Sequence, residues 1–189
     1  MRSVSIFPYP DGKDRPQGNL SILIRKGGQY QEKSVLVKDD SDQFVSKKLL
    51  VPSGEIIKVV NGANLVLNRA KTQMANLFVG NQSTQRFVNR MVFGTGGHAP
   101  GDTSVPIPPQ PTDTQLDSSI LTKPLASYEF NSSTSVTIIA FIVEGEANGF
   151  TITESGLLAA DNTLVARRTF AGLNKTSEFV FEFRHTILF

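Results

Sequence analysis

The stretch "EFVFEFRHTILF" at residues 178–189 decides the fold class. Its large apolar residues and one histidine alternate with mostly polar ones and share a single side: Phe179, Phe181, Phe183, His185 and Ile187. A period of two indicates a strand with one face against a core. Half-buried strands of this kind are typical of antiparallel sheets. We therefore expect a mainly antiparallel β protein whose core receives the phenylalanines of this strand.

Other stretches of the second half also predict strands. Residues 86–94, "RFVNRMVFG", alternate, and residues 135–146, "SVTIIAFIVEGE", form the most β-branched run and should be a central strand. Residues 149–160 and 163–170 flank Asp161-Asn162, a plausible turn pair. The simplest fold that accommodates these strands is an antiparallel β-sandwich with one packed helix.

That helix is predicted at about residues 62–79. Asn61 or Asn64 can cap its start, and Gly80 can end it. Its apolar residues follow a 3.6-residue spacing: Val66, Ala70, Met74, Leu77 and Phe78. We expect this face to cover a sheet.

The sequence before the helix predicts an arm and a small β unit. Residues 1–19 hold three prolines and little periodicity, which favours an extended N-terminal arm. Residues 20–60 contain strand-like runs on both sides of "GGQYQ" (27–31), which predict a hairpin, and a Pro-Ser-Gly turn between two further runs. Residues 61–189 then form the domain of helix and sandwich.

Composition excludes several classes of function. The 189 residues include no cysteine, which removes disulfides, thiolate metal sites and cysteine nucleophiles. The start lacks the apolar segment of a secretory signal, and no apolar run is long enough to span a bilayer. We expect a soluble protein with no membrane partner.

The net charge of +2 conceals a strong segregation of charge. Residues 1–96 carry 14 Lys and Arg against 7 Asp and Glu, whereas residues 97–163 carry one lysine against 8 acids. A basic half suggests nucleic-acid binding, but its bases are dispersed, so nucleic acid is not the partner that we expect. The segregation favours opposite charges that meet within the fold or across a subunit contact.

The glycine-rich loop "GTGGHA" at residues 94–99 matches half of a dinucleotide-binding fingerprint. Such a loop must open a helix whose N-terminus faces the phosphates, yet the proline-rich residues 100–111 follow. We therefore predict no cofactor and assign the glycines to a sharp exit from the preceding strand. His98 and Asp102 lie four apart, but two ligands do not make a metal site.

Catalytic arrangements are not predicted either. There is no G-x-S-x-G nucleophile motif, and Glu144, Glu146 and Glu154 are interpreted as solvated edges of strands and turns. His185 is interpreted as a hydrogen-bonded or interfacial histidine. The sequence predicts a protein that is not an enzyme.

Residues 98–116 are expected to form a stiff, extended strap, whose part "PIPPQPTDTQL" (106–116) should adopt the polyproline II conformation. A segment that loses little entropy on ordering suits an assembly contact. The residues predicted to contact other proteins lie in the arm and in this strap: Phe7, Tyr9, His98, Asp102, Pro106, Pro108, Pro109 and Pro111.

Residues 61–189 resemble virion proteins of tailed bacteriophages, in particular the attachment domains of tail-collar fibre and baseplate proteins. The shared order is a helix, a strand ending in "MVFGTGG", a "PPQPTDTQL" connection, and a strand pair of the form I-x-E-x-G-L-x-x-x-D-x-T-L-x-A. That last pattern falls on Ile152, Glu154, Gly156, Leu157, Asp161, Thr163, Leu164 and Ala166.

The resemblance implies a structural component of a phage tail or baseplate, of the fibre-attachment or tail and neck adaptor type. It would assemble in the host cytoplasm into the virion as a trimer or ring, with other tail proteins as partners and without a cofactor. Two alternatives stay open. One is a virion or neck protein that contacts nucleic acid, and the other is a carbohydrate-binding β-sandwich module, although the chain has no tryptophan and only three tyrosines.

Overall fold

The computed structural model describes residues 17–39, 41, 43–78 and 87–189. Its first seven elements are β1 (Gln17–Lys26), β2 (Tyr30–Lys38), β3 (Phe44–Pro52), β4 (Ile56–Val66), α1 (Asn68–Phe78), β5 (Val88–Gly94) and β6 (His98–Ala99). Next come β7 (Asp102–Pro106), β8 (Ser119–Pro124), β9 (Ser127–Ser132), β10 (Ser135–Ile142), β11 (Thr151–Ala159), β12 (Leu164–Asn174) and β13 (Phe179–Leu188).

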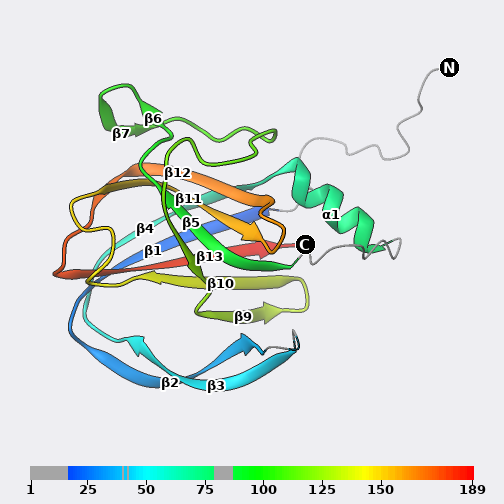
Figure 1. Ribbon diagram of the computed structural model, residues 1–189, viewed down its shortest axis with the longest axis horizontal. Coiled ribbons are helices and arrows are strands. Elements are labelled where there is room, and N and C mark those ends of the chain that lie inside the picture. Colours follow the sequence, from blue (N-terminus) through cyan, green and yellow to red (C-terminus); the bar gives the residue numbers. More distant parts are fainter. Residues whose placement is uncertain (1–16, 40, 42, 79–86) are drawn as a thin grey trace.

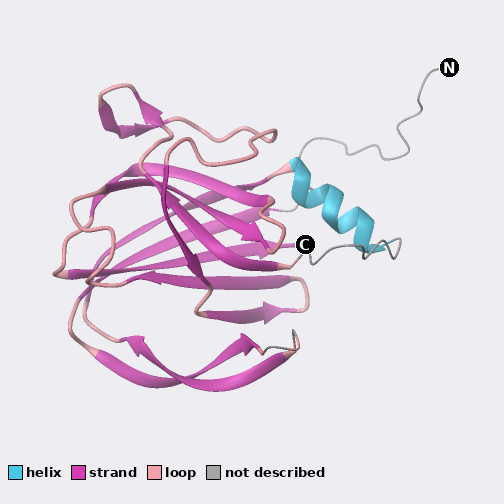
Figure 2. Ribbon diagram, in the orientation of Figure 1, coloured by secondary structure: helices cyan, strands magenta, loops and turns pink. Residues whose placement is uncertain are grey.

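Eleven strands form one antiparallel sheet that curls into two layers (Figures 1 and 2). Their order is β3-β2-β9-β10-β13-β1-β4-β12-β11-β5-β8, and β6 and β7 form a separate small ribbon. This confirms the predicted mainly antiparallel β fold with one helix. Strand β10, predicted to be central, lies between β9 and β13.

The two layers are joined along both edges. On one edge, β4 pairs with β1 over most of its length and with β12 through its last two residues. On the other edge, the Leu125 N–H donates to Asn89 O in β5, and the next N–H, that of Ala126, donates to Ile139 O in β10. The chain from β8 to β9 therefore passes from one layer to the other, and a single apolar core is enclosed between them.

The alternating pattern of residues 178–189 fills that core as expected. Phe181 and Phe183 are fully buried, and the Phe183 ring lies 4.6 Å from the Phe93 ring of β5 in the opposite layer. Aromatic contacts of this kind dominate core energetics because each ring removes a large apolar area from water.

A buried polar group interrupts this apolar core. His185 on β13 is fully buried, and its Nδ1 lies 3.0 Å from the side-chain amide nitrogen of Asn64. Because that amide nitrogen can only donate, Nδ1 accepts, and the Nε2–H donates to the Ser155 hydroxyl at 3.0 Å. Burial, with a smaller effect from Arg168, lowers the pKa of His185 to about 3.

The helix is shorter than predicted. It spans Asn68–Phe78, and residues 61–66 continue strand β4. The expected cap Asn64 instead bonds to His185, so tertiary contact with β1 and β13 overrides the helical pattern of its neighbours. Ala70 is buried as expected, but Phe78 is 91% exposed, so the predicted apolar face does not extend to the last turn.

The strand pairing of the first 60 residues also differs from the sequence prediction. No hairpin forms at residues 27–31, because β1 pairs with β13 and β4, while β2 pairs with β3. The predicted boundary at residue 60 is therefore crossed by the sheet, and the β2–β3 hairpin joins that sheet through a single residue pair with β9 (Figure 1). A local turn signal does not determine which strand pairs with β1. The long-range pairing with β13 determines it instead. Most of the predicted arm, residues 1–16, lies outside the described residues.

The buried neutral histidine predicts acid sensitivity. Below the ordinary histidine pKa of about 6.5, the unfolded chain binds a proton that folded His185 does not. Stability should therefore be intact above pH 7 and fall by up to about 1.4 kcal/mol per pH unit as the pH drops from about 6 towards 3. Urea denaturation between pH 7 and pH 5 measures this loss, and His185→Gln should remove most of it.

The imidazole signals provide a check on the intact chain. In NMR spectra the ring resonances of His185 should stay constant from pH 8 down to pH 4.5. A titration of these resonances near pH 6 would contradict the assignment of a neutral buried ring.

Candidate functional site

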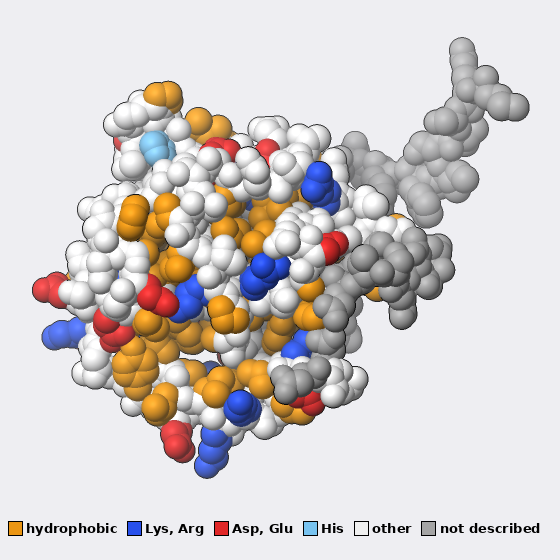
Figure 3. All heavy atoms as spheres, in the orientation of Figure 1, with side chains coloured by type: hydrophobic (Ala, Val, Ile, Leu, Met, Phe, Trp, Pro, Cys, Tyr) orange, Lys and Arg blue, Asp and Glu red, His pale blue; other side chains and the backbone are white. Residues whose placement is uncertain are grey.

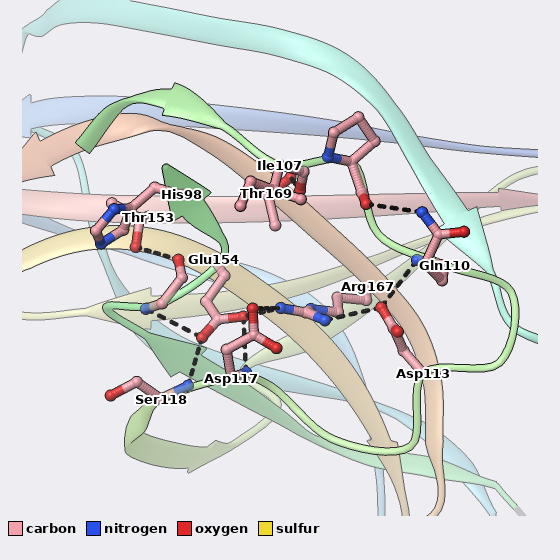
Figure 4. Close-up of polar contacts among 12 residues, drawn as sticks. His98, Ile107, Gln110, Asp113, Asp117, Ser118, Thr153, Glu154, Arg167 and Thr169 are labelled. Atoms are coloured by element: carbon pink, nitrogen blue, oxygen red, sulfur yellow. Dashed lines mark hydrogen bonds and ion pairs between the residues drawn. The ribbon is translucent and has the colours of Figure 1, made fainter. Parts of the chain in front are cut away.

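The glycine-rich loop follows β5 and lies against the outer face of β11 and β12 (Figure 4). Gly97 has a φ of +69°, in the left-handed region that glycine tolerates. Gly96 is required by close approach, because a Cβ there would lie 2.8 Å from Glu154 Oε1 and 2.7 Å from Asp117 Cβ. The predicted sharp exit from the strand is confirmed, and it brings backbone N–H groups against a carboxylate.

That carboxylate belongs to Glu154 of β11, which is fully buried. Its Oε1 accepts hydrogen bonds from the Gly96 N–H at 3.1 Å and the Ser118 N–H at 2.9 Å, and its Oε2 accepts from the Asp117 N–H at 3.2 Å. One loop N–H, that of Gly96, and the two N–H groups of Asp117 and Ser118 thus bind an anion as the donors of a phosphate loop do, but the anion is a side chain of the same protein. The interpretation of Glu154 as a solvated edge residue is wrong.

Arg167 of β12 neutralises this buried charge. Its Nη2 lies 2.6 Å from Glu154 Oε2 and 2.8 Å from Asp117 Oδ2, and its Nη1 lies 2.7 Å from Asp113 Oδ2. Burial disfavours the guanidinium cation, but the hydrogen bonds to Asp117, Glu154 and Asp113 outweigh it and raise the pKa of Arg167. One cation therefore joins three carboxylates from β11 and from the segment after the glycine loop.

The strap is held against its own sheet by this group. Leu116 is buried against Val92 of β5, Leu164 of β12 and Leu67, which lies between β4 and α1. Asp113 on the same segment bonds to Arg167, so an apolar anchor and an ionic anchor stand three residues apart. The strap is consequently part of the folded domain along residues 111–118.

The strap also positions the start of the helix. Pro111 O accepts a hydrogen bond from the Asn68 N–H at 3.0 Å, which satisfies one of the free donors of the first turn of α1. The Gln110 carbonyl accepts from the Asp113 N–H at 3.0 Å, which reverses the chain. This turn corrects the expectation of a continuous polyproline segment to residue 116, and residues 98–106 form the β6–β7 ribbon instead.

The contact residues predicted in the strap are placed as follows. Both ring nitrogens of His98 lie near backbone carbonyls, Nδ1 2.8 Å from Ala99 O and Nε2 3.0 Å from Thr95 O. Asp102 is exposed, and hydrogen bonds from Ser104 lower its pKa. Pro106 and Pro108 are exposed, and Pro109 and Pro111 are half-buried. Phe7 and Tyr9 lie outside the described residues.

The other two carboxylates of the sequence analysis lie in the loop after β10. Glu144 Oε1 accepts from the Gly28 N–H at 2.6 Å, and Tyr30 donates its hydroxyl to the same carboxylate, which lowers the pKa of Glu144. Glu146 pairs with Lys123 at 2.5 Å. These bonds tie the loop to β8 and to the β1–β2 connection, so the two carboxylates act locally as structural contacts.

Opposite charges meet within the fold across β1, β13 and β9. Arg25 pairs with Glu182 at 2.7 Å, Glu182 with Arg184, and Arg184 with Glu129. Lys33 of β2 reaches Glu129 at 3.5 Å and so links the β2–β3 hairpin to this chain of charges. Among the described residues, no group of three or more acidic or histidine side chains is arranged to hold a metal ion. No helix in the described ranges is long and apolar enough to cross a membrane.

An apolar cavity of about 370 Å³ lies between α1, the β2–β3 hairpin and the end of the sandwich. Ala70, Met74 and Leu77 of the helix line one side, and Val136 and Ile187 of the sheet line another. The cavity opens to the surface, because Leu77 is 51% exposed. In the space-filling view, hydrophobic side chains also gather where the hairpin meets the sandwich (Figure 3).

Comparisons of the chain with protein-family models, with curated proteins and with solved structures give no match.

Sequence reasoning missed the role of Arg167 and of the three carboxylates around it. A signal was present in the Asp161-Asn162 turn, which sets the register of β11 against β12 and pairs Glu154 with Thr169. Residue 167 lies two positions from that partner on the same strand, so it is a diagonal neighbour of Glu154. The bulges in this strand pair, and the distant origin of Asp113 and Asp117, carry no such local signal.

Loss of the Glu154 charge should destabilise the fold strongly. Glu154→Gln leaves the buried guanidinium without its most buried partner, which predicts a loss of about 3–5 kcal/mol in the free energy of unfolding. Lys33→Gln breaks an exposed ion pair and should cost about 1 kcal/mol or less. Urea denaturation of both variants compares the two losses, and similar values would contradict a structural role for the buried pair.

Proposed function

We propose that the protein is a non-enzymatic structural subunit of a bacteriophage tail or baseplate and acts through protein–protein assembly. The observation that supports this proposal is the placement of the residues by which the sequence resembles tail attachment proteins. Those residues build the β11–β12 hairpin and hold the strap, so this sequence pattern has a structural role.

Each residue of that pattern has a structural part in the hairpin. Glu154 binds the strap, and Gly156 allows Leu116 and Leu164 to approach the sheet closely, because a Cβ there would lie 2.6 Å from Leu164 Cδ1. Asp161 Oδ1 accepts from the Thr163 N–H at 3.0 Å and shapes the turn. Such a hairpin supports the proposal because it presents a rigid loop rather than a reactive group.

Exposed apolar side chains support a role in protein contact. One group of them lies on the β2–β3 hairpin, the first half of β4 and the end of α1: Phe44, Leu50, Ile56, Ile57, Val59, Leu77 and Phe78. Strand β3 has β2 as its one partner among the described strands, so one edge offers backbone groups to a further strand. Apolar surface next to an unpaired edge is typical of an assembly interface.

The strap offers a second contact surface. Its inner side is fixed by Asp113 and Leu116, while Pro106, Ile107 and Pro108 face outward, with Ile107 49% exposed. An ordered apolar segment loses little entropy when a neighbour binds it. The predicted contact role of Pro106 and Pro108 therefore remains part of this proposal.

Nucleic-acid contact is the second candidate function. Lys47 and Lys48 on β3 and Lys58 on β4 are exposed, and no ion pair involving them is present among the described residues. If they bind phosphates, the affinity for duplex DNA should fall steeply with salt. Fluorescence anisotropy with labelled DNA at 50 and 200 mM salt tests this, and absence of binding at both would remove the candidate.

The assembly proposal predicts a particle of several copies in solution. Light scattering with negative-stain imaging of the full chain should give the mass and shape of a trimer or ring. Deletion of residues 1–15 should reduce that mass while the circular dichroism spectrum and melting temperature stay unchanged. A full chain that is monomeric at all concentrations and joins no larger particle would contradict the proposal.

A further inference from the structure

The apolar cavity is built to hold an apolar partner rather than a polar ligand. Its polar side chains already have partners: the Tyr128 hydroxyl donates to Val88 O at 2.8 Å, and Gln73 Nε2 donates to Asp161 at 3.3 Å. The Lys38 ammonium lies 3.8 Å from the centroid of the Phe87 ring. An occupant would therefore be bound mainly by apolar and aromatic contact.

The size and opening of the cavity admit side chains of a peptide. Its volume of about 370 Å³ lies at the lower end of the range of ligand pockets, about 300–1,000 Å³. Phe44 is 44% exposed and Leu77 51%, and these two side chains stand on the hairpin side and the helix side of the cavity. Filling it would cover both and remove apolar surface from water.

The described part of the chain begins at the end of the molecule where the cavity lies. Gln17 is paired with Leu188, and Ile187 and Phe189 line the cavity. Sixteen residues precede Gln17 in the sequence, and they contain the segment "IFPYP" at residues 6–10. Two of its residues are aromatic, and its two prolines restrict the backbone, so the segment matches an apolar site and loses little entropy on binding.

The length of this segment favours the cavity of another copy. Phe7 precedes Gln17 by ten residues, and a proline-rich chain at about 3.1 Å per residue spans roughly 30 Å over that distance. The cavity of the same copy begins next to Leu188, the partner of Gln17, which is much closer than this span. The cavity of an adjacent copy offers the same apolar lining, and we place it within the roughly 30 Å that the arm can span.

We propose that residues Ile6–Tyr9 of each copy occupy the apolar cavity between α1, the β2–β3 hairpin and the end of the sandwich in a neighbouring copy. This inference rests on the proposed assembly function and names its contact. When the arm of each copy binds the next copy in turn, the interface is heterologous. Such an interface closes into a trimer or ring when the rotation between copies allows it.

Engineered disulfides test the contact directly, because the chain contains no cysteine. Two singly substituted full-length chains, Phe7→Cys and Met74→Cys, are co-expressed with different tags and oxidised. A disulfide between the two introduced thiols joins differently tagged chains and is necessarily intermolecular. Lys58→Cys, which lies on β4 outside the cavity, replaces Met74→Cys in the matched control.

The expected result is a heterodimer for the cavity pair, identified by mass spectrometry of the linked peptides, with only background linkage for the control. A particle of several copies without this bond would overturn the inference and leave the proposed function standing. A monomeric full chain would instead overturn the proposed function. A bond that forms only within one chain of the double variant Phe7→Cys/Met74→Cys would also overturn the inference, because the arm would then fill its own cavity.

A charge in the arm provides a second test that spares the folded domain. Phe7→Asp places a carboxylate in the apolar site and should raise the dissociation constant of the assembly at least tenfold with no change in the circular dichroism spectrum. Ser5→Asp adds the same charge outside the proposed segment and should change the constant less than threefold. Equal effects of the two variants would contradict the role of residues 6–9.

Discussion

The interaction on which the site depends is the buried ion pair between Glu154 and Arg167. A carboxylate inside a protein is costly unless it is paired and hydrogen-bonded, and Glu154 has a guanidinium and three backbone N–H groups. One of those N–H groups belongs to Gly96 in the glycine loop, and the other two belong to Asp117 and Ser118, directly after the strap. The charge is satisfied only when β11, β12 and residues 94–118 are all in place, so one pair links the hairpin, the loop and the strap.

This interaction changes how the glycine loop is understood. From its sequence the loop resembles a phosphate site, and its Gly96 N–H does bind an anion, together with the N–H groups of Asp117 and Ser118. The anion is supplied by the chain itself, which gives a permanent structural contact where an enzyme would bind a ligand. Asp113 and Leu116 then fix the strap, and Pro111 O accepts a hydrogen bond from the first turn of α1. Because α1 lines the apolar cavity, the ion pair is connected to the cavity through the strap and the helix. The inner side of the strap is thereby ordered while Pro106 and Pro108 remain exposed at the surface.

Much of the fold could be predicted from residues with strong local patterns. Phe181 and Phe183 alternate along one strand, and the Asp161-Asn162 pair forms the turn between β11 and β12, as the sequence indicates. The pairing of β1 could not be predicted, because its partner β13 lies more than 150 residues away and the local turn at Gly27-Gly28 suggests another partner. The site was missed for the same reason: Glu154 has the sequence context of an exposed strand residue, and its burial arises from segments that are remote in sequence.

The central claim is that the glycine loop binds Glu154 as an internal anion and that this contact keeps the strap ordered. Amide hydrogen exchange of the full chain measures it residue by residue. The account predicts slow exchange for the N–H groups of Gly96, Asp117 and Ser118, comparable to that of β13, and selective loss of this protection in Glu154→Gln. Rapid exchange of these three amides in the unaltered protein, at the rate of exposed loops, would contradict it.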